Sequence, residues 1–186
     1  MTDDELIAAF QAGDAEALGE LLQRHKSALY GYLLRLTGRR DAAEDIFQDV
    51  FLKLVRDPSA YGQRGKFRPW LFTVARNAAM DHFRRQGSRA EVPLHGEGDL
   101  PGPADRTASP EPGPEAAAVN KELSEIIAAA LGRLSPDQRE VFYLRHYSGL
   151  SFKEIAEMLG LPIGTVLARM SRAAALLRKD ISKGAQ

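Results

Sequence analysis

The stretch Ser151-Phe152-Lys153-Glu154-Ile155-Ala156-Glu157-Met158-Leu159-Gly160-Leu161-Pro162-Ile163-Gly164-Thr165-Val166 decides the fold of the last part of this chain. Ser151 and Glu154 are spaced as a capping box, which begins a helix. Gly160 then supplies a tight turn, and Leu161-Pro162 restarts a second helix. The small Ala156 lies inside the first helix and would let the two helices cross closely. The pattern therefore predicts a helix-turn-helix over residues 151–178.

The second helix of this motif carries residues suited to nucleic acid. In a helix-turn-helix, residues early in the second helix reach base edges in the major groove of DNA. Thr165, Arg169 and Arg172 lie at such positions, and an arginine can bind either guanine or phosphate. An ordinary helical hairpin with a solvated basic face would show the same residues, and this alternative stays open here.

The charge of the chain is balanced overall but divided into blocks. There are 25 basic and 25 acidic side chains among 186 residues. Residues 1–22 carry six acids and no base, and residues 90–125 carry eight acids against two bases. By contrast, residues 66–89 carry six bases against one acid, and residues 133–186 carry nine bases against five acids. Local fields steer binding, so two basic segments remain candidates for nucleic-acid contact.

Composition excludes several classes of protein. The chain has no cysteine, and its four histidines lie far apart in sequence, so we expect neither disulfides nor a structural metal, and no cofactor. No run of about 18 apolar residues suggests insertion in a membrane. The acidic start, with no apolar stretch after it, does not resemble a secretory leader. These features predict a soluble, cytoplasmic protein.

A proline- and glycine-rich segment divides the chain in two. Residues 87–117 hold the prolines and glycines of 96–103 and 109–114 and few apolar side chains, which is typical of a flexible acidic linker. We therefore expect one domain at 1–86 and a second at 118–186. Helical spacing of apolar residues recurs in both halves and no alternating strand pattern occurs, so the predicted fold is all-α: two small helical domains on a linker.

Helix boundaries follow from capping and breaking residues. We expect helices to begin at Asp14, at a capping box over Asp41-Ala42-Ala43-Glu44, near Pro69, and at Ser135-Pro136-Asp137-Gln138. We expect helices to end at Gly38, at Asp57-Pro58 and near Arg85, and a further helix to span Val119 to Leu134.

A second signal lies in residues 66–86, where basic and aromatic side chains alternate. Bases neutralise phosphate and exposed rings stack on unpaired bases, so this segment suits a surface that holds a melted DNA strand. For Trp70, Leu71 and Val74 the buried face of an amphipathic helix is the favoured interpretation. For Arg76, Arg84 and Arg85 a solvated face and a DNA contact are equally plausible.

A third signal is a cluster of polar side chains in one expected helix: Glu44, Asp45, Gln48 and Asp49, beside Phe47 and Phe51. Asp45 and Asp49 are one turn apart and share a face. A metal pair or acid–base chemistry is conceivable, but no nucleophile, histidine or phosphate-binding loop accompanies them. The pattern favours a patch that docks a partner helix, and the protein is not expected to be an enzyme.

Taken in order, these segments resemble the extracytoplasmic-function (ECF) sigma factors of bacterial RNA polymerase. The run 41–51 is similar to their second conserved region, and the run Phe67 to Asp81 resembles their promoter-melting and −10-reading segment. The runs 134–142, 154–156 and 164–166 resemble their fourth region, which reads the −35 element. The resemblance covers about residues 8–86 and 120–180, with the middle region of larger sigma factors missing.

The resemblance implies three sets of contacts. Core RNA polymerase, through its clamp helices, would bind Glu44, Asp45, Gln48, Asp49 and Phe51. Melted −10 DNA would contact Lys66, Arg68, Trp70, Arg76, Asn77, Arg84 and Arg85, together with the loop from Asp57 to Lys66. Duplex −35 DNA would contact Lys153, Thr165, Leu167, Arg169 and Arg172. Members of the family are commonly held inactive by an anti-sigma factor, which is a further expected partner.

The sequence departs from the family pattern in the second helix of the motif. Leu167 and Ala168 stand where polar residues are frequent, and Ala174 and Ala175 replace positions that are often charged. Leu167 could contact a thymine methyl group or a regulator. Two alternatives to a sigma factor therefore remain: a helix-turn-helix regulator that binds operators alone, and a polymerase adaptor that does not read DNA.

Overall fold

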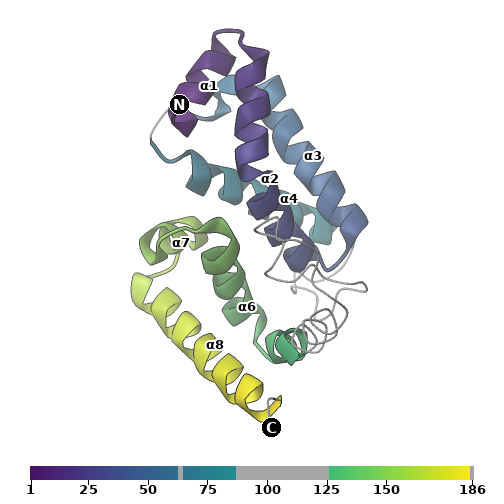
Figure 1. Ribbon diagram of the computed structural model, residues 1–186, viewed down its shortest axis with the longest axis vertical. Coiled ribbons are helices and arrows are strands. Elements are labelled where there is room, and N and C mark those ends of the chain that lie inside the picture. Colours follow the sequence, from purple (N-terminus) through teal and green to yellow (C-terminus); the bar gives the residue numbers. More distant parts are fainter. Residues whose placement is uncertain (63–64, 87–125, 185–186) are drawn as a thin grey trace, which may run out of the picture.

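The computed structural model describes residues 1–62, 65–86 and 126–184, with side chains described up to residue 180. Every regular element in these residues is helical, which confirms the predicted all-α class. Figure 1 shows two helical units, one above the other. The N-terminal unit consists of α1 (Asp3–Gln11), α2 (Ala15–Thr37), α3 (Arg40–Arg56), η1 (Pro58–Ala60) and α4 (Phe67–Arg85). The C-terminal unit consists of a helix at 126–132 followed by α6 (Pro136–Tyr143), η3 (Leu144–Ser148), α7 (Phe152–Leu159) and α8 (Ile163–Gly184).

Local capping explains most boundaries of the N-terminal unit. The side chain of Asp14 accepts hydrogen bonds from the backbone N–H groups of Glu16 and Ala17 at the start of α2. Gly38 ends that helix in the left-handed conformation, with φ of 69°. Glycine adopts this conformation without a steric penalty because it has no Cβ. Asp57 ends α3 as expected.

The predicted capping box at Asp41 is wrong. Helix α3 begins at Arg40, and the residue before it, Arg39, makes no side-chain cap. Asp41 lies inside the first turn, where its carboxylate pairs with the Arg39 guanidinium and accepts from the backbone N–H of Ala42. The carboxylate that was expected to cap the helix is therefore already bound by Arg39 and by the first turn itself.

Helix α1, which the sequence analysis did not single out, closes the N-terminal unit. It begins with a capping box between Thr2 and Glu5 and buries Leu6 and Ile7. Asp3 in its first turn binds α2, because its carboxylate oxygens lie 2.7 Å from Arg24 Nη1 and 2.8 Å from His25 Nε2.

The C-terminal unit begins as predicted but contains an unexpected turn. Ser135 and Gln138 form the capping box of α6. After α6 the chain makes a π-helical turn, η3, which ends at Gly149 with φ of 66°. Of the predicted helix from Val119 to Leu134, the structure describes only the part after residue 125, which is helical at 126–132.

The helix-turn-helix is confirmed. Ser151 and Glu154 form the capping box of α7, and Gly160 ends α7 with φ of 66°. Ala156 is 6% exposed and Val166 is fully buried, and both belong to one apolar cluster, in which α7 packs against α8.

The two units pack against one another. A single apolar cluster joins Tyr32, Phe72 and Leu71 of the N-terminal unit with Val141 and Leu144 of the C-terminal unit. In Figure 1, α4 and the end of α2 lie at the base of the upper unit, directly over α6 and α7. The predicted linker at 87–117 lies outside the described residues, so its boundaries stay a prediction.

Candidate functional site

The exposed face of α3 carries the polar cluster that the sequence singled out. Glu44, Asp45, Gln48 and Asp49 are all exposed, while Ile46 and Val50 between them are buried. The helix therefore holds the polar residues outward by burying its opposite face. Tyr30 Oη donates a hydrogen bond of 3.4 Å to Glu44 Oε1, which attaches the start of this face to α2.

Two apolar residues extend this face, and the sequence analysis missed them. Leu52 is 44% exposed and Val55 is 48% exposed, one and two turns beyond the acidic residues. We call Glu44, Asp45, Gln48, Asp49, Leu52 and Val55 the α3 face. Phe51 was expected to contact the polymerase from the surface. Instead it is 6% exposed and packs on Phe47 in the core. Mixed acidic and apolar character suits a basic, amphipathic partner helix.

Helix α4 and the loop before it build an aromatic cluster. The ring centroids of Tyr61, Phe67 and Trp70 lie 5.3 to 5.7 Å from one another. Tyr61 Oη donates to Asp4 Oδ1 at 2.6 Å and accepts from the Lys66 backbone N–H at 2.8 Å, which fixes the loop to α1. Leu71 is buried as expected, but Trp70 is only half-buried and lines a pocket with Ser59 and Pro69.

The bases of α4 divide into two groups. Arg84 and Arg85, at the exposed C-terminal end, contact Asp81 of their own helix, and Asn77 is exposed. Lys66, Arg68 and Arg76 instead face the C-terminal unit.

Two of these bases are paired with carboxylates of the C-terminal unit. Arg76 Nε lies 2.7 Å from Glu140 Oε1, and Lys66 Nζ lies 3.1 Å from Glu157 Oε2. Burial lowers the pKa of Arg76, but the hydrogen bond and charge of Glu140 outweigh it and the pKa is raised. The structure thus places three of the residues predicted to bind the −10 strand (Lys66, Arg68 and Arg76) in contact with another part of the same chain.

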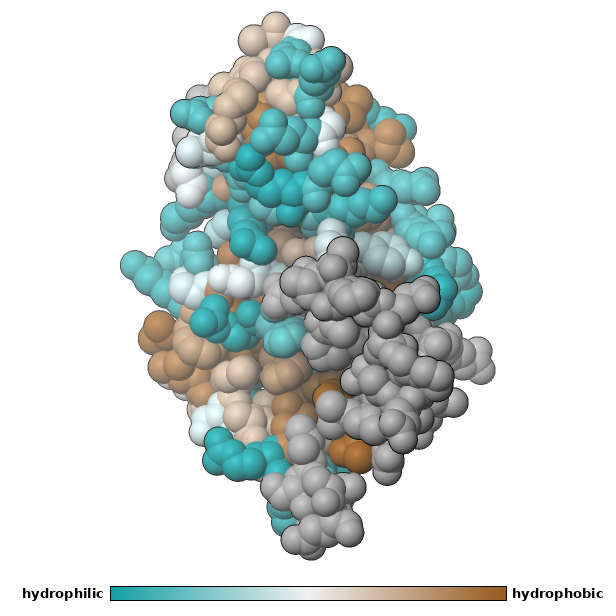
Figure 2. Space-filling model, viewed as in Figure 1, coloured by the Kyte–Doolittle hydropathy of each residue, from teal (hydrophilic) through white to brown (hydrophobic). Residues whose placement is uncertain are grey.

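Helix α8 presents the residues predicted for duplex DNA. Arg172 and Lys153 are exposed, and Thr165 is half-buried near the start of the helix. Arg169 Nη2 lies 2.5 Å from Asp137 Oδ2 of α6, so this guanidinium is occupied. Leu167 is 45% exposed, and Ile163, one turn earlier, is 49% exposed. Figure 2 shows this apolar surface beside the turn between α7 and α8.

The described residues offer neither a metal site nor a membrane-spanning helix. No group of three or more histidine, aspartate or glutamate side chains that could hold a metal ion occurs in these ranges. Within the same part of the chain, no helix is long and apolar enough to cross a bilayer.

Comparison with known proteins decides the family. The family model described as sigma-70 region 2 matches residues 21–89, and that of sigma-70 region 4 matches residues 124–177. ECF RNA polymerase sigma factor SigL of Mycobacterium tuberculosis is 35% identical over 95% of this chain and 96% of its own length. The chain belongs to the ECF sigma factors.

Other ECF sigma factors support this membership. SigE of Mycolicibacterium smegmatis is 34% identical over 95% of this chain and 67% of its own length. CnrH, solved with the cytosolic domain of CnrY, superposes with a TM-score of 0.67 at 26% identity, covering 97% of each chain. RpoE of Bartonella quintana, solved with the anti-sigma factor NepR, has a TM-score of 0.66 at 26% identity over 88% of this chain and 96% of its own.

As an ECF sigma factor, the chain directs promoter-specific initiation of transcription by RNA polymerase. Most of α2, together with α3 and α4, falls within region 2, and α6 and α7 with most of α8 fall within region 4. The α3 face and the α4 aromatic cluster are therefore region 2 surfaces, and Leu167 and Arg172 belong to region 4.

Proposed function

We propose that the α3 face docks this sigma factor on the clamp helices of core RNA polymerase. The supporting observation is that four polar residues and two large apolar residues are exposed along one side of a single helix. Asp45 and Asp49 would attract basic groups of the core, and Leu52 and Val55 would supply apolar contact. Phe51 would support the face from the core side rather than touch the partner.

The aromatic cluster and the bases of α4 would hold the melted −10 strand. An unpaired base would enter the pocket beside Trp70 and stack on its ring. Lys66, Arg68 and Arg76 would neutralise phosphates on either side of that base. Asn77, Arg84 and Arg85 extend the same helix and would contact the backbone further along the strand.

Helix α8 would read the −35 duplex. Arg172 and Thr165 would contact base edges or phosphates, and Lys153 in α7 would bind the flanking backbone. Leu167, which is 45% exposed, would contact the methyl group of a thymine. Arg169 would exchange the Asp137 carboxylate for a DNA phosphate.

We also propose that an anti-sigma factor controls the chain, because the RpoE neighbour was solved with NepR. The sigma factor would act in the cytoplasm, where polymerase and chromosome meet. It would contribute no catalytic step, since the polymerase itself carries out RNA synthesis.

The docking proposal is tested by reversing one charge on the α3 face. Asp45→Arg is expected to lower affinity for purified core polymerase at least tenfold, because it repels the basic groups that the acidic face attracts. Glu16→Arg is the matched control, since Glu16 is an exposed acid on another helix, α2. Equal core affinity of Asp45→Arg and the control would refute this assignment of the docking surface.

A further inference from the structure

Helix α1 binds the loop that precedes α4 at both of its ends. Gln11 Nε2 donates a hydrogen bond of 2.6 Å to the carbonyl oxygen of Pro58, near the start of the loop. Toward the other end, Asp4 Oδ1 accepts a hydrogen bond of 2.6 Å from Tyr61 Oη, and Asp4 Oδ2 would lie 3.7 Å from a Cβ added to Gly65. Figure 1 shows the chain passing α1 on its way from α3 to α4. One short helix therefore sets the path of this loop.

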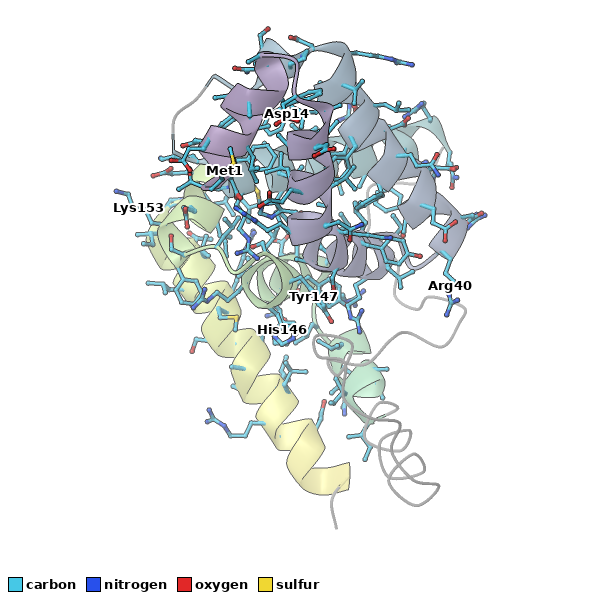
Figure 3. All side chains as sticks on the ribbon, turned by 45° about the horizontal axis from the view of Figure 1, so that its top comes forward. Met1, Asp14, Arg40, His146, Tyr147 and Lys153 are labelled. Atoms are coloured by element: carbon cyan, nitrogen blue, oxygen red, sulfur yellow. The ribbon has the colours of Figure 1, made fainter. Side chains whose placement is uncertain are left out.

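The helix itself is anchored by other side chains. Asp3 binds two side chains of α2, and the apolar residues Leu6 and Ile7 are buried. Figure 3 shows α1 alongside α2, with the labelled Met1 at its start. Asp4 therefore lies on a helix whose position is fixed independently of the loop.

The hydrogen bond from Asp4 continues through Tyr61 to the start of α4. Tyr61 Oη also accepts a hydrogen bond of 2.8 Å from the backbone N–H of Lys66, the residue before α4. The Tyr61 side chain is 3% exposed, its ring centroid lies 5.6 Å from that of Trp70, and it lines the pocket beside Trp70. A single hydroxyl group thus connects α1, the loop and the pocket that we propose for an unpaired base.

We propose that Asp4 is a positioning residue for the unpaired −10 base. The proposal rests on the function proposed above for the aromatic cluster. Asp4 does not touch the DNA, but it orients the Tyr61 hydroxyl, which holds the loop and the start of α4 in the shape that receives the base. A pocket that is ordered in advance loses less conformational entropy on binding. Because the sigma-70 region 2 match begins at residue 21, this role belongs to a helix outside the matched region.

Charge alone predicts the opposite effect of Asp4. An acid close to a surface that binds phosphate repels the strand, so its removal would tighten binding if Asp4 had no positioning role. Two variants separate these effects. Asp4→Asn removes the charge but keeps an oxygen that can accept from Tyr61, whereas Asp4→Ala removes both.

The strand affinity of the holoenzyme tests the proposal. Core polymerase is assembled with each variant, and the probe is a fluorescent single strand carrying the −10 region of a promoter that the wild-type holoenzyme transcribes. Asp4→Ala is expected to weaken binding of this strand about five- to tenfold, and Asp4→Asn is expected to stay within about twofold of the wild type. Glu16→Ala, which removes an exposed acid of α2, is the control and is expected to leave the affinity unchanged.

A second readout shows whether the loss belongs to the base pocket. In a series of strands, each base of the −10 region in turn is replaced by an abasic site. The wild type is expected to have one position at which loss of the base weakens binding most, because that base stacks on Trp70. In Asp4→Ala this position loses its special sensitivity, while the other positions keep theirs. A general loss of stability would instead weaken the binding of every strand alike.

A variant of the tyrosine tests the same hydrogen bonds without changing α1. Tyr61→Phe keeps the ring but lacks the hydroxyl, so it is expected to weaken strand binding as Asp4→Ala does, and the double variant should bind no more weakly than either one. Trp70 is the only tryptophan in the chain, so quenching of its fluorescence by acrylamide in the free protein reports the order of the pocket. Both single variants are expected to increase this quenching, and Asp4→Asn is not.

The outcomes separate the positioning role from the function on which it rests. Unchanged or tighter strand binding by Asp4→Ala, or an equal loss in Asp4→Asn and Asp4→Ala, would overturn the role of Asp4. If the wild-type holoenzyme binds the strand equally well whichever single base is removed, the function proposed for the pocket is wrong, and the role of Asp4 is overturned with it.

Discussion

Arg139 is a charged residue in the core of the C-terminal unit. It is 1% exposed, and its guanidinium donates to the carbonyl oxygens of Leu131, Gly132 and Leu134 at 2.9 to 3.2 Å. These carbonyls end the helix at 126–132, where backbone acceptors lack helical partners. The side chain of Arg139 in α6 thus supplies hydrogen bonds to the carbonyl groups at the end of the preceding helix.

Replacement by lysine should show that geometry matters here as well as charge. A lysine cannot reproduce the planar fork, so Arg139→Lys is expected to lower the free energy of unfolding by about 3 kcal/mol. Urea denaturation followed by circular dichroism measures this. The control is Arg133→Lys, because the exposed Arg133 side chain pairs with the largely buried Asp180 and a lysine can keep that ion pair, so the change should cost less than about 1 kcal/mol. A similar small loss in both variants would contradict the role of Arg139.

His25 should make stability depend on pH. It is 4% exposed, and burial lowers its pKa below the ordinary 6.5, although Asp3 at 2.8 Å partly offsets this. The unfolded chain therefore binds a proton at higher pH than the folded chain does. The stability contributed by neutral His25 is fully present above pH 6.5 and is lost as the pH falls toward the lower folded pKa.

Thermal melts at pH 7.5 and at pH 5.5 measure this effect. The wild type is expected to lose more stability over this interval than His25→Gln, whose side chain can donate to Asp3 but does not titrate. An equal loss in wild type and His25→Gln would exclude His25 as the titrating group.

At the scale of elements, the turn of the helix-turn-helix depends on one glycine. Gly160 has φ of 66° and no atom within 4 Å of an added Cβ, so its substitution costs only backbone strain. Gly160→Ala is expected to destabilise region 4 by about 1 kcal/mol. Gly164→Ala, in the first turn of α8 and equally free of contacts, should instead stabilise it by less than about 1 kcal/mol. Changes of the same sign, measured by denaturation, would contradict this explanation.

Elements with local causes could be predicted from sequence. The capping boxes at Ser135 and Ser151 and the stops at Gly38 and Gly160 depend on residues within one turn of each other, and all four are confirmed. The start of α3 was mispredicted: the helix begins at Arg40, and Asp41 pairs with Arg39 from inside the first turn. The π-helical turn η3 could not be predicted, because it is only five residues long and does not change the helical spacing of apolar residues enough to be recognised.

At the scale of the whole molecule, the contact between regions 2 and 4 could not be predicted. Arg76 and Glu140 are 64 residues apart, and each fits a solvated helix face when considered alone. The exposure of Leu52 and Val55 could not be predicted either. Helical spacing shows which residues share a face, but it does not show whether another helix covers that face. The sequence could therefore predict the acidic face of α3, but neither its apolar extension nor the contact of region 4 with α4.

The most direct test of this account is run-off transcription with purified core polymerase on a library of promoter fragments, with and without this protein. Initiation at defined sites only when the protein is present, lost with Asp45→Arg and weakened with Arg172→Ala, is the predicted result. Absence of protein-dependent initiation on every template, with the protein folded and bound to core, would contradict the central claim that this chain is a sigma factor.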